Sequence, residues 1–157
     1  MRFTVSFINR GILMFWASMF SIIFLTNFCD GLKAIGALPA AWRFASGNYL
    51  FMQTVVARYE CPIVVTAVLF AGVIVWEALG AALFWRAAIS SLRLPAENGN
   101  ARHAAFTVGL ALWAAFILID EICIAYELEA AHLRLLIAQL VSLLPCELVR
   151  DESNRSS

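Results

Sequence analysis

Glu77 is a single carboxylate within an apolar run that covers residues 62–85. A run of this length can cross the hydrocarbon core of a bilayer, and an ionisable side chain inside it needs a partner charge, a proton or a functional role. The helical face of Glu77 includes Gly80 and Ala81, small residues that let a second helix approach closely. The pattern therefore predicts that Glu77 faces the inside of a helical bundle and not lipid.

Arg10 is the predicted partner of Glu77. Helix geometry places Arg10 about 27 Å before Phe28 and Glu77 about 23 Å after Pro62, so the two opposite charges would lie at similar depth. An Arg10–Glu77 pair that holds the first two spans together is therefore our preferred hypothesis. Two alternatives stay open: a proton or ion relay through Glu77, and a neutral, protonated Glu77 bonded to a backbone carbonyl.

A second set of reactive side chains gathers at the predicted outer rim of the bundle. Asp120, Cys123 and Glu127 follow i, i+3, i+7 spacing and so share one helical face. The full set at this surface comprises Cys29, Asp30, Cys61, Asp120, Glu121, Cys123, Glu127 and His132. Thiolate and imidazole ligands would suit zinc or copper, but no CxxC or HxxxH spacing supports a metal site. Free, inert cysteines are the preferred interpretation, and a Cys29–Cys61 disulfide is the other alternative.

The composition indicates that lipid is the solvent of most of the chain. Of the 157 residues, 62% are hydrophobic and 14% are charged, and the formal net charge is zero. Soluble domains have roughly 45–50% apolar and about 25% charged residues. The charge balance gives no reason to expect a nucleic-acid partner. No Gly-rich phosphate loop, nucleophile elbow or His-x-x-x-His pair occurs, so the sequence predicts neither an enzyme nor a cofactor.

Long apolar blocks predict four membrane-spanning helices, at residues 8–28, 62–85, 103–124 and 130–149. The fourth is the weakest because Arg134 interrupts it, so a re-entrant or surface-lying helix is its alternative. The basic start of the chain also fits a secretory signal, but bulky residues end the first run and favour a retained helix. Residues 1–149 would then form one transmembrane domain, and residues 150–157 a polar disordered tail.

The first loop is predicted to contain an additional helix at residues 48–60. Asn48 is its candidate N-cap, and Phe51, Val55 and Tyr59 share one face. This pattern is typical of an amphipathic helix at a membrane surface. The predicted fold is therefore all-α: an integral membrane four-helix bundle with an additional amphipathic interfacial helix in the first outer loop.

The distribution of basic residues predicts the orientation of the chain. With both termini in the cytoplasm, the inner side carries Arg2, Arg10, Arg86, Arg93, Arg102, Arg150 and Arg155. The outer side then carries Lys33, Arg43, Arg58 and Arg134, together with most of the carboxylates. The excess of arginine on one side predicts cytoplasmic N- and C-termini, in a bacterial inner membrane.

Three short motifs follow one another along the chain: Asn48-Tyr49-Leu50-Phe51-Met52, then Trp76-Glu77-Ala78-Leu79, then Glu129-Ala130-Ala131-His132-Leu133-Arg134. Their order resembles a group of small bacterial integral membrane proteins of uncharacterised function. That group has four spans, an extended first loop and a Trp-Glu-Ala element in the second span. The likeness covers about residues 8–145, and residues 120–127 depart from the aromatic, Gly-containing pattern of the group. The resemblance implies the topology and no activity.

Small size and few interior polar residues favour a non-catalytic accessory or structural subunit that packs against larger membrane-protein partners. The main alternative is a small homo-oligomeric transporter of ions, protons or solutes that uses Glu77. A membrane protein that binds metal at the outer rim is the third possibility. The expected partners are the lipid bilayer and either another membrane protein or further copies of the chain, with no nucleic acid.

Overall fold

The computed structural model describes residues 2–93 and 99–154, and these fold into five α-helices without any strand. In chain order the helices are α1 Arg2–Ala34, α2 Asn48–Ala57, α3 Ile63–Arg93, α4 Gly99–Ile122 and α5 Tyr126–Asn154. All except α2 are long and apolar enough to cross a membrane. The all-helical class and the four long apolar helices predicted from the sequence are confirmed.

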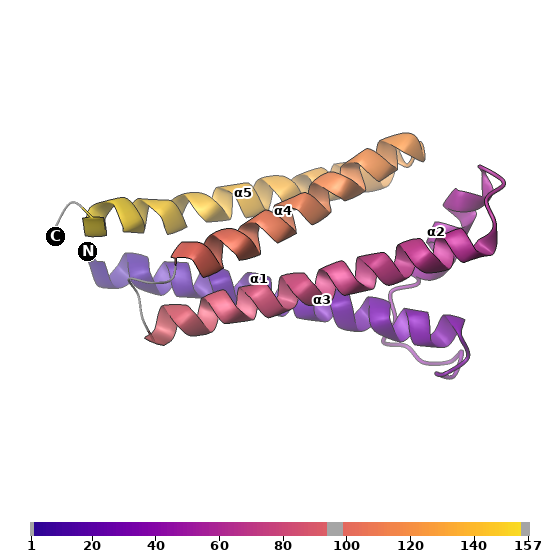
Figure 1. Ribbon diagram of the computed structural model, residues 1–157, viewed down its shortest axis with the longest axis horizontal. Coiled ribbons are helices and arrows are strands. Elements are labelled where there is room, and N and C mark those ends of the chain that lie inside the picture. The colour runs from indigo at the N-terminus through magenta and orange to yellow at the C-terminus, as the bar shows by residue number, and fades with distance from the viewer. Residues whose placement is uncertain (1, 94–98, 155–157) are drawn as a thin grey trace.

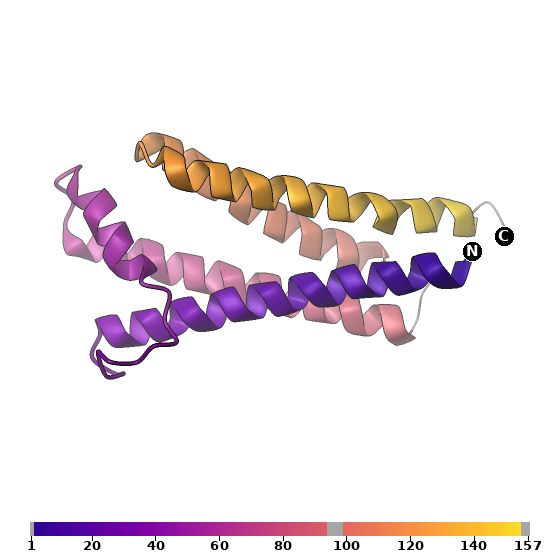
Figure 2. The same ribbon diagram turned by 180° about the vertical axis from the view of Figure 1, so that it is seen from behind.

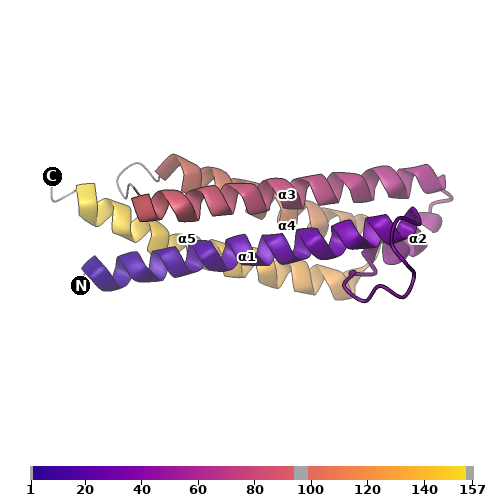
Figure 3. The same cartoon turned by 90° about the horizontal axis from the view of Figure 1, so that it is seen from below.

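The long helices lie in one elongated bundle with both chain termini at the same end (Figures 1 and 3). We call this the terminal end and the opposite end, which carries α2, the α2 end. Helix α1 packs against α3 and α4 packs against α5, while α3 and α4 join the two pairs. The pairs lie close together at the terminal end and diverge toward the α2 end (Figures 1 and 2).

An aromatic core joins the two pairs. Phe20 of α1 is fully buried, and its ring centroid lies 5.3 Å from that of Phe84 in α3 and 5.6 Å from that of Trp113 in α4. Phe84 in turn contacts Phe106 of α4 at 5.3 Å. Offset and tilted ring pairs of this kind contribute energy beyond the area they bury.

Helices α1 and α3 approach closely at Gly80. A Cβ atom at this position would lie 2.5 Å from Cδ1 of Phe20, well inside any normal contact distance. The absence of a side chain at Gly80 is therefore what lets the Phe20 ring pack against the backbone of α3.

Helices α1 and α3 are longer than the predicted spans. Helix α1 continues past Phe28 to Ala34, and α3 continues past Trp85 to Arg93. The predicted limits were the ends of the apolar runs. Backbone hydrogen bonds carry a helix into the polar residues that follow such a run.

The C-terminal segment also differs from the prediction. Helix α5 is continuous from Tyr126 through Pro145 to Asn154, so residues 150–154 are helical instead of disordered. The last three residues of the predicted tail lie outside the described part of the chain.

The short helix α2 lies where a loop helix was predicted, but it ends at Ala57 and not at residue 60. Its N-cap is Gly47, with φ of 80°, so the predicted capping role of Asn48 is wrong by one residue. Glycine adopts this left-handed conformation without the steric cost that a Cβ atom imposes.

We expect Gly80→Ala to lower the free energy of unfolding by about 1–3 kcal/mol, because the Phe20 ring has to shift away from the new methyl group. Gly72 in the same helix is the matched control, since a Cβ atom there meets nothing within 4 Å. Gly72→Ala should leave stability unchanged or raise it by up to about 1 kcal/mol. Unfolding of both variants in detergent, followed by circular dichroism, measures the difference. Equal stabilities would contradict the close packing at Gly80.

Candidate functional site: a buried carboxyl group and its amide partners

Glu77 is buried between α1 and α3, with 1% of its surface exposed, as its small-residue face predicted. Its Oε1 atom accepts a hydrogen bond of 2.7 Å from Nδ2 of Asn27 in α1. Its Oε2 atom is also buried and has no hydrogen-bond partner in the described part of the chain. A neutral amide is therefore the one hydrogen-bond partner of the carboxyl group among the described residues.

A second amide connects Asn27 to the surface. Oδ1 of Asn27 accepts a hydrogen bond of 2.9 Å from Nδ2 of Asn48, the first residue of α2. Asn27 is buried, whereas Asn48 is exposed. The hydrogen-bonded chain Asn48–Asn27–Glu77 thus leads from the surface of the α2 end to the buried carboxyl group.

Asn27 was not among the predicted site residues, because the predicted partner of Glu77 was an opposite charge. The available signal was an amide inside the first apolar run, where neighbouring positions are Ile, Phe, Leu and Thr. Polar side chains in such runs form hydrogen bonds between helices.

The predicted Arg10–Glu77 pair is not formed. Arg10 lies 17 residues before Asn27 in the same helix, or about 25 Å away along its axis. The prediction assumed that Phe28 and Pro62 lie at the same membrane surface, and it counted the depth of Arg10 and Glu77 from that surface. In the structure Asn27 lies beside Glu77, so Phe28, taken as the end of the first span, lies near the middle of α3. Arg10 is instead near the terminal end, and its buried Nε has no hydrogen-bond partner among the described residues.

Asp30 attaches α2 to α1. Its Oδ2 atom accepts hydrogen bonds from the backbone N–H of Tyr49 at 2.8 Å and from Oγ of Ser46 at 3.2 Å. Because the N-cap Gly47 has no side chain, the Asp30 carboxylate caps α2 from a different helix. A negative charge at a helix N-terminus is also favoured by the helix dipole.

The predicted rim residues do not form one cluster. Asp120 of α4 and His132 of α5 form a pair, with 2.5 Å between Oδ2 and Nδ1. The imidazole also packs on the rings of Trp113 and Phe116, with centroids 6.3 and 4.8 Å away. This pair joins α4 to α5, separately from the contact of Asp30 with α2.

The remaining predicted rim residues make no shared site. Glu121 and Glu127 are exposed, and so is Cys61. Cys29 and Cys123 are half-buried, and all four cysteines are free, so the Cys29–Cys61 disulfide is absent. Within the described residues, no three His, Cys, Asp or Glu side chains lie close enough together to hold a metal ion.

Two further contacts, which the sequence analysis missed, bridge the diverging pairs at the α2 end. The hydroxyl group of Tyr59 donates to the carbonyl oxygen of Ile122, and Nη1 of Arg58 donates to that of Cys123 at 3.4 Å. They connect the turn after α2 with the turn between α4 and α5. Their acceptors are backbone atoms, so residue spacing gave no signal for them.

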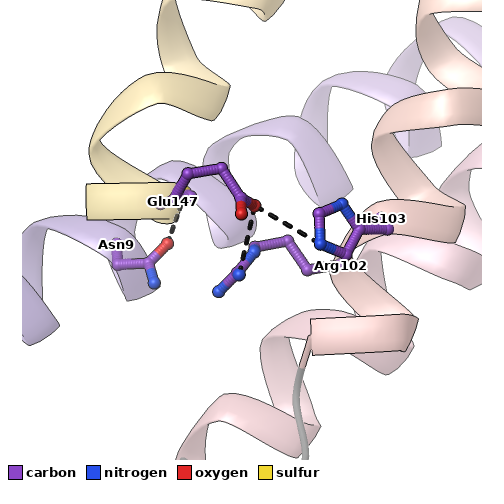
Figure 4. Close-up of polar contacts among 5 residues, drawn as sticks. Asn9, Arg102, His103 and Glu147 are labelled. Atoms are coloured by element: carbon purple, nitrogen blue, oxygen red, sulfur yellow. Dashed lines mark hydrogen bonds and ion pairs between the residues drawn. The ribbon is translucent and has the colours of Figure 1, made fainter. Parts of the chain in front are cut away.

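The terminal end has its own polar cluster (Figure 4). Buried Arg102 of α4 forms an ion pair of 3.2 Å with Oε1 of Glu147 in α5, and His103 lies 3.6 Å from the same oxygen. The thiol of Cys146 donates to Oδ1 of Asn9 in α1. These contacts join three helices where the two pairs meet, and the sequence analysis identified none of them.

Comparison with protein families, curated proteins and solved structures gives no match for this chain. The resemblance to small bacterial membrane proteins therefore stays a prediction.

Removing the Asp30 carboxylate should loosen α2. We expect Asp30→Ala to lower the free energy that holds α2 folded against α1 by about 1 kcal/mol, the usual contribution of a helix cap. Amide hydrogen exchange over residues 48–57 should then be about fivefold faster. Exposed Glu60 in the following turn is the control, since Glu60→Ala removes a carboxylate that does not cap α2. Unchanged exchange in Asp30→Ala would contradict the capping role.

The Cys123 thiol, which lies between α4 and α5, should react slowly with maleimide near pH 7. Burial raises its pKa, the Asp120 carboxylate raises it further, and Arg58 lowers it. A raised pKa reduces the reactive thiolate at neutral pH, so the rate should climb from about pH 7 to about pH 9. Asp120→Asn should speed the reaction near pH 7, and Glu121→Gln, at an exposed neighbour, should not. The rates are measured in a chain that keeps Cys123 as its one cysteine, and equal rates would exclude the effect of Asp120.

Proposed function

We propose that this chain is a non-catalytic integral membrane protein that serves as an accessory or structural subunit and packs through α5 against a larger membrane-protein partner. The observation that carries the proposal is the exposure of α5. Of the four long helices α5 is the least apolar, and 6% of its span is buried, against 28% in α1, 22% in α3 and 33% in α4. A self-sufficient bundle would cover its least apolar helix most, because lipid favours the most apolar surface.

The exposed surface of α5 has features of a helix–helix interface. Ala131, Arg134, Ala138 and Val141 follow i, i+3, i+7, i+10 spacing, and all four are exposed. Small residues allow close approach of another helix, and a charge at this depth favours a polar partner over acyl chains. This spacing supports a protein as the occupant of the α5 surface.

The membrane setting is part of the same proposal. Both termini lie at one end of the bundle (Figure 1), as an even number of crossings requires. Together with the excess of arginine on that side, this supports cytoplasmic termini in a bacterial inner membrane. Helix α2 would then lie at the outer surface, and its exposed Leu50 and Phe51 support an interfacial position.

Site-specific crosslinking tests the proposal. A photoreactive residue at Ala138 or Val141, in tagged protein in its native membrane, should yield one defined adduct with a larger membrane protein. The same residue at exposed Val68 or Val75 of α3 is the control and should yield none. The complex should also survive mild detergent at fixed stoichiometry, as measured by size and mass spectrometry. Adducts of α5 with lipid alone, or with further copies of the chain alone, would refute an accessory role.

A further inference from the structure

The surroundings of Glu77 favour a neutral carboxyl group. Its one hydrogen-bond donor is the uncharged amide of Asn27, and it has no ion-pair partner in the described part of the chain. Arg86 lies nine residues further along α3, about 13 Å away, and is exposed. Lys33 instead donates to the carbonyl oxygen of Trp42 at 3.1 Å. An ionised carboxylate at this depth would be an uncompensated buried charge, which is costly.

The α2 end offers a polar route to this carboxyl group. Two hydrogen bonds connect Glu77 to the surface: Asn48 donates to Asn27, and Asn27 donates to Glu77. The Asn48–Asn27 bond crosses from α2 to α1 and therefore breaks whenever α2 moves away. Asp30, three residues after Asn27, holds the start of α2 against α1.

The opposite direction is closed by apolar packing. Three residues along α3 from Glu77, Gly80 lies against the Phe20 ring with no room for one additional carbon. Beyond it the rings of Phe84 and Trp16 stack with centroids 6.4 Å apart, and both residues are buried. Among the described residues, no hydrogen bond continues from Glu77 toward the terminal end; the bond from Nε1 of Trp85 to Oγ of Ser21 is separate from this chain.

We infer that Glu77 is a proton-binding site that exchanges protons with the aqueous phase at the α2 end. The site is closed while the hydrogen bond from Asn48 to Asn27 holds α2 against α1. The proton is bound at Oε2, the oxygen that accepts no hydrogen bond. This function goes beyond the subunit role proposed above. The site is one-sided: it exchanges protons with one face of the membrane and is not part of a path through it.

The exchange step follows from the geometry. When α2 moves and the Asn48–Asn27 bond opens, water reaches Glu77. The O–H bond at Oε2 breaks, its electron pair stays on the oxygen, and the proton passes to water. The Asn27 amide keeps donating to Oε1 and stabilises the carboxylate that is left, because hydrogen bonds to a charged group are the stronger ones. Uptake is the reverse.

Few other titratable groups face this site. Helix α1 contributes Cys29 and Asp30, and α2 contributes Tyr49, whose ring packs on Phe70 of α3. Helix α4 has no titratable residue between His103 and Asp120, and α3 has none between Ile63 and Arg86 besides Glu77 itself.

Infrared spectroscopy of the full-length protein in lipid vesicles tests the inference. At neutral pH the spectrum should contain the C=O band of a protonated carboxylic acid, and Glu77→Gln should remove it. After transfer to D₂O, the hydrogen-to-deuterium shift of this band should be about fivefold faster in Asn48→Ala, as expected for the loss of one hydrogen bond. Asn100→Ala, which removes an exposed asparagine of α4, is the matched control and should exchange like the wild type.

Three outcomes would overturn the inference. The first is the absence of a Glu77-dependent band, and the second is an equal exchange rate in Asn48→Ala and Asn100→Ala. The third is titration of the band by a pH change applied at the terminal side of oriented vesicles, because the site would then not be one-sided. The exchange measurement uses a surface variant with Glu77 intact, so it decides the question even if Glu77→Gln fails to fold.

Discussion

The hydrogen bond between Asn27 and Glu77 is the constraint on which the arrangement of α1 and α3 depends. A carboxyl group buried among apolar helices needs a polar partner, and in this structure Asn27 is the side chain that supplies it. Once these two residues are opposite each other, the antiparallel register follows. Phe20 then packs against Gly80. Gly31 packs against Ile74, so that a Cβ atom added to Gly31 would lie 3.3 Å from Cδ1 of Ile74. A shift by one helical turn would break the polar contact and drive Phe20 into a larger residue.

The two ends of the bundle are joined in different ways. At the terminal end the ion pair between buried Arg102 and half-buried Glu147 joins α4 to α5 (Figure 4). The contact between the buried side chains of Cys146 and Asn9 joins α5 to α1. At the α2 end the pairs diverge, and the contacts that bridge them, from Arg58 and Tyr59, use exposed side chains. Exposed hydrogen bonds contribute less than buried ones because water competes for their partners. The bundle is therefore more firmly closed at the terminal end than at the α2 end, where the Glu77 site opens.

The length of the apolar runs predicted the helices, because a helix that crosses about 30 Å of hydrocarbon needs some 20 apolar residues. The small residues beside Glu77 likewise predicted its burial. The partner of Glu77 was not predictable in the same way, because it depends on the register between α1 and α3. That register is a tertiary property of the packed helices, and the spacing of residues along one helix does not reveal it. Charge complementarity favoured Arg10 as the partner of Glu77, but the residue that lies opposite Glu77 is Asn27, a neutral amide. For Asp120 and His132 the topology predicted a shared end, but only side-chain geometry decides that they touch.

The proposed partner surface and the proton site lie in different helix pairs, yet they are physically connected. A protein bound to α5 would contact the α4–α5 pair and leave Asn48 accessible. The contact between α3 and α4 offers a direct route for an influence on Glu77. Trp76, the residue before Glu77, donates from Nε1 to the carbonyl oxygen of Val108 in α4 at 3.1 Å. A displacement of α4 by a bound partner would therefore act on the turn of α3 that holds the carboxyl group. Loss of the Asn27 bond would in turn change how closely α1 packs, so each event would affect the free energy of the other.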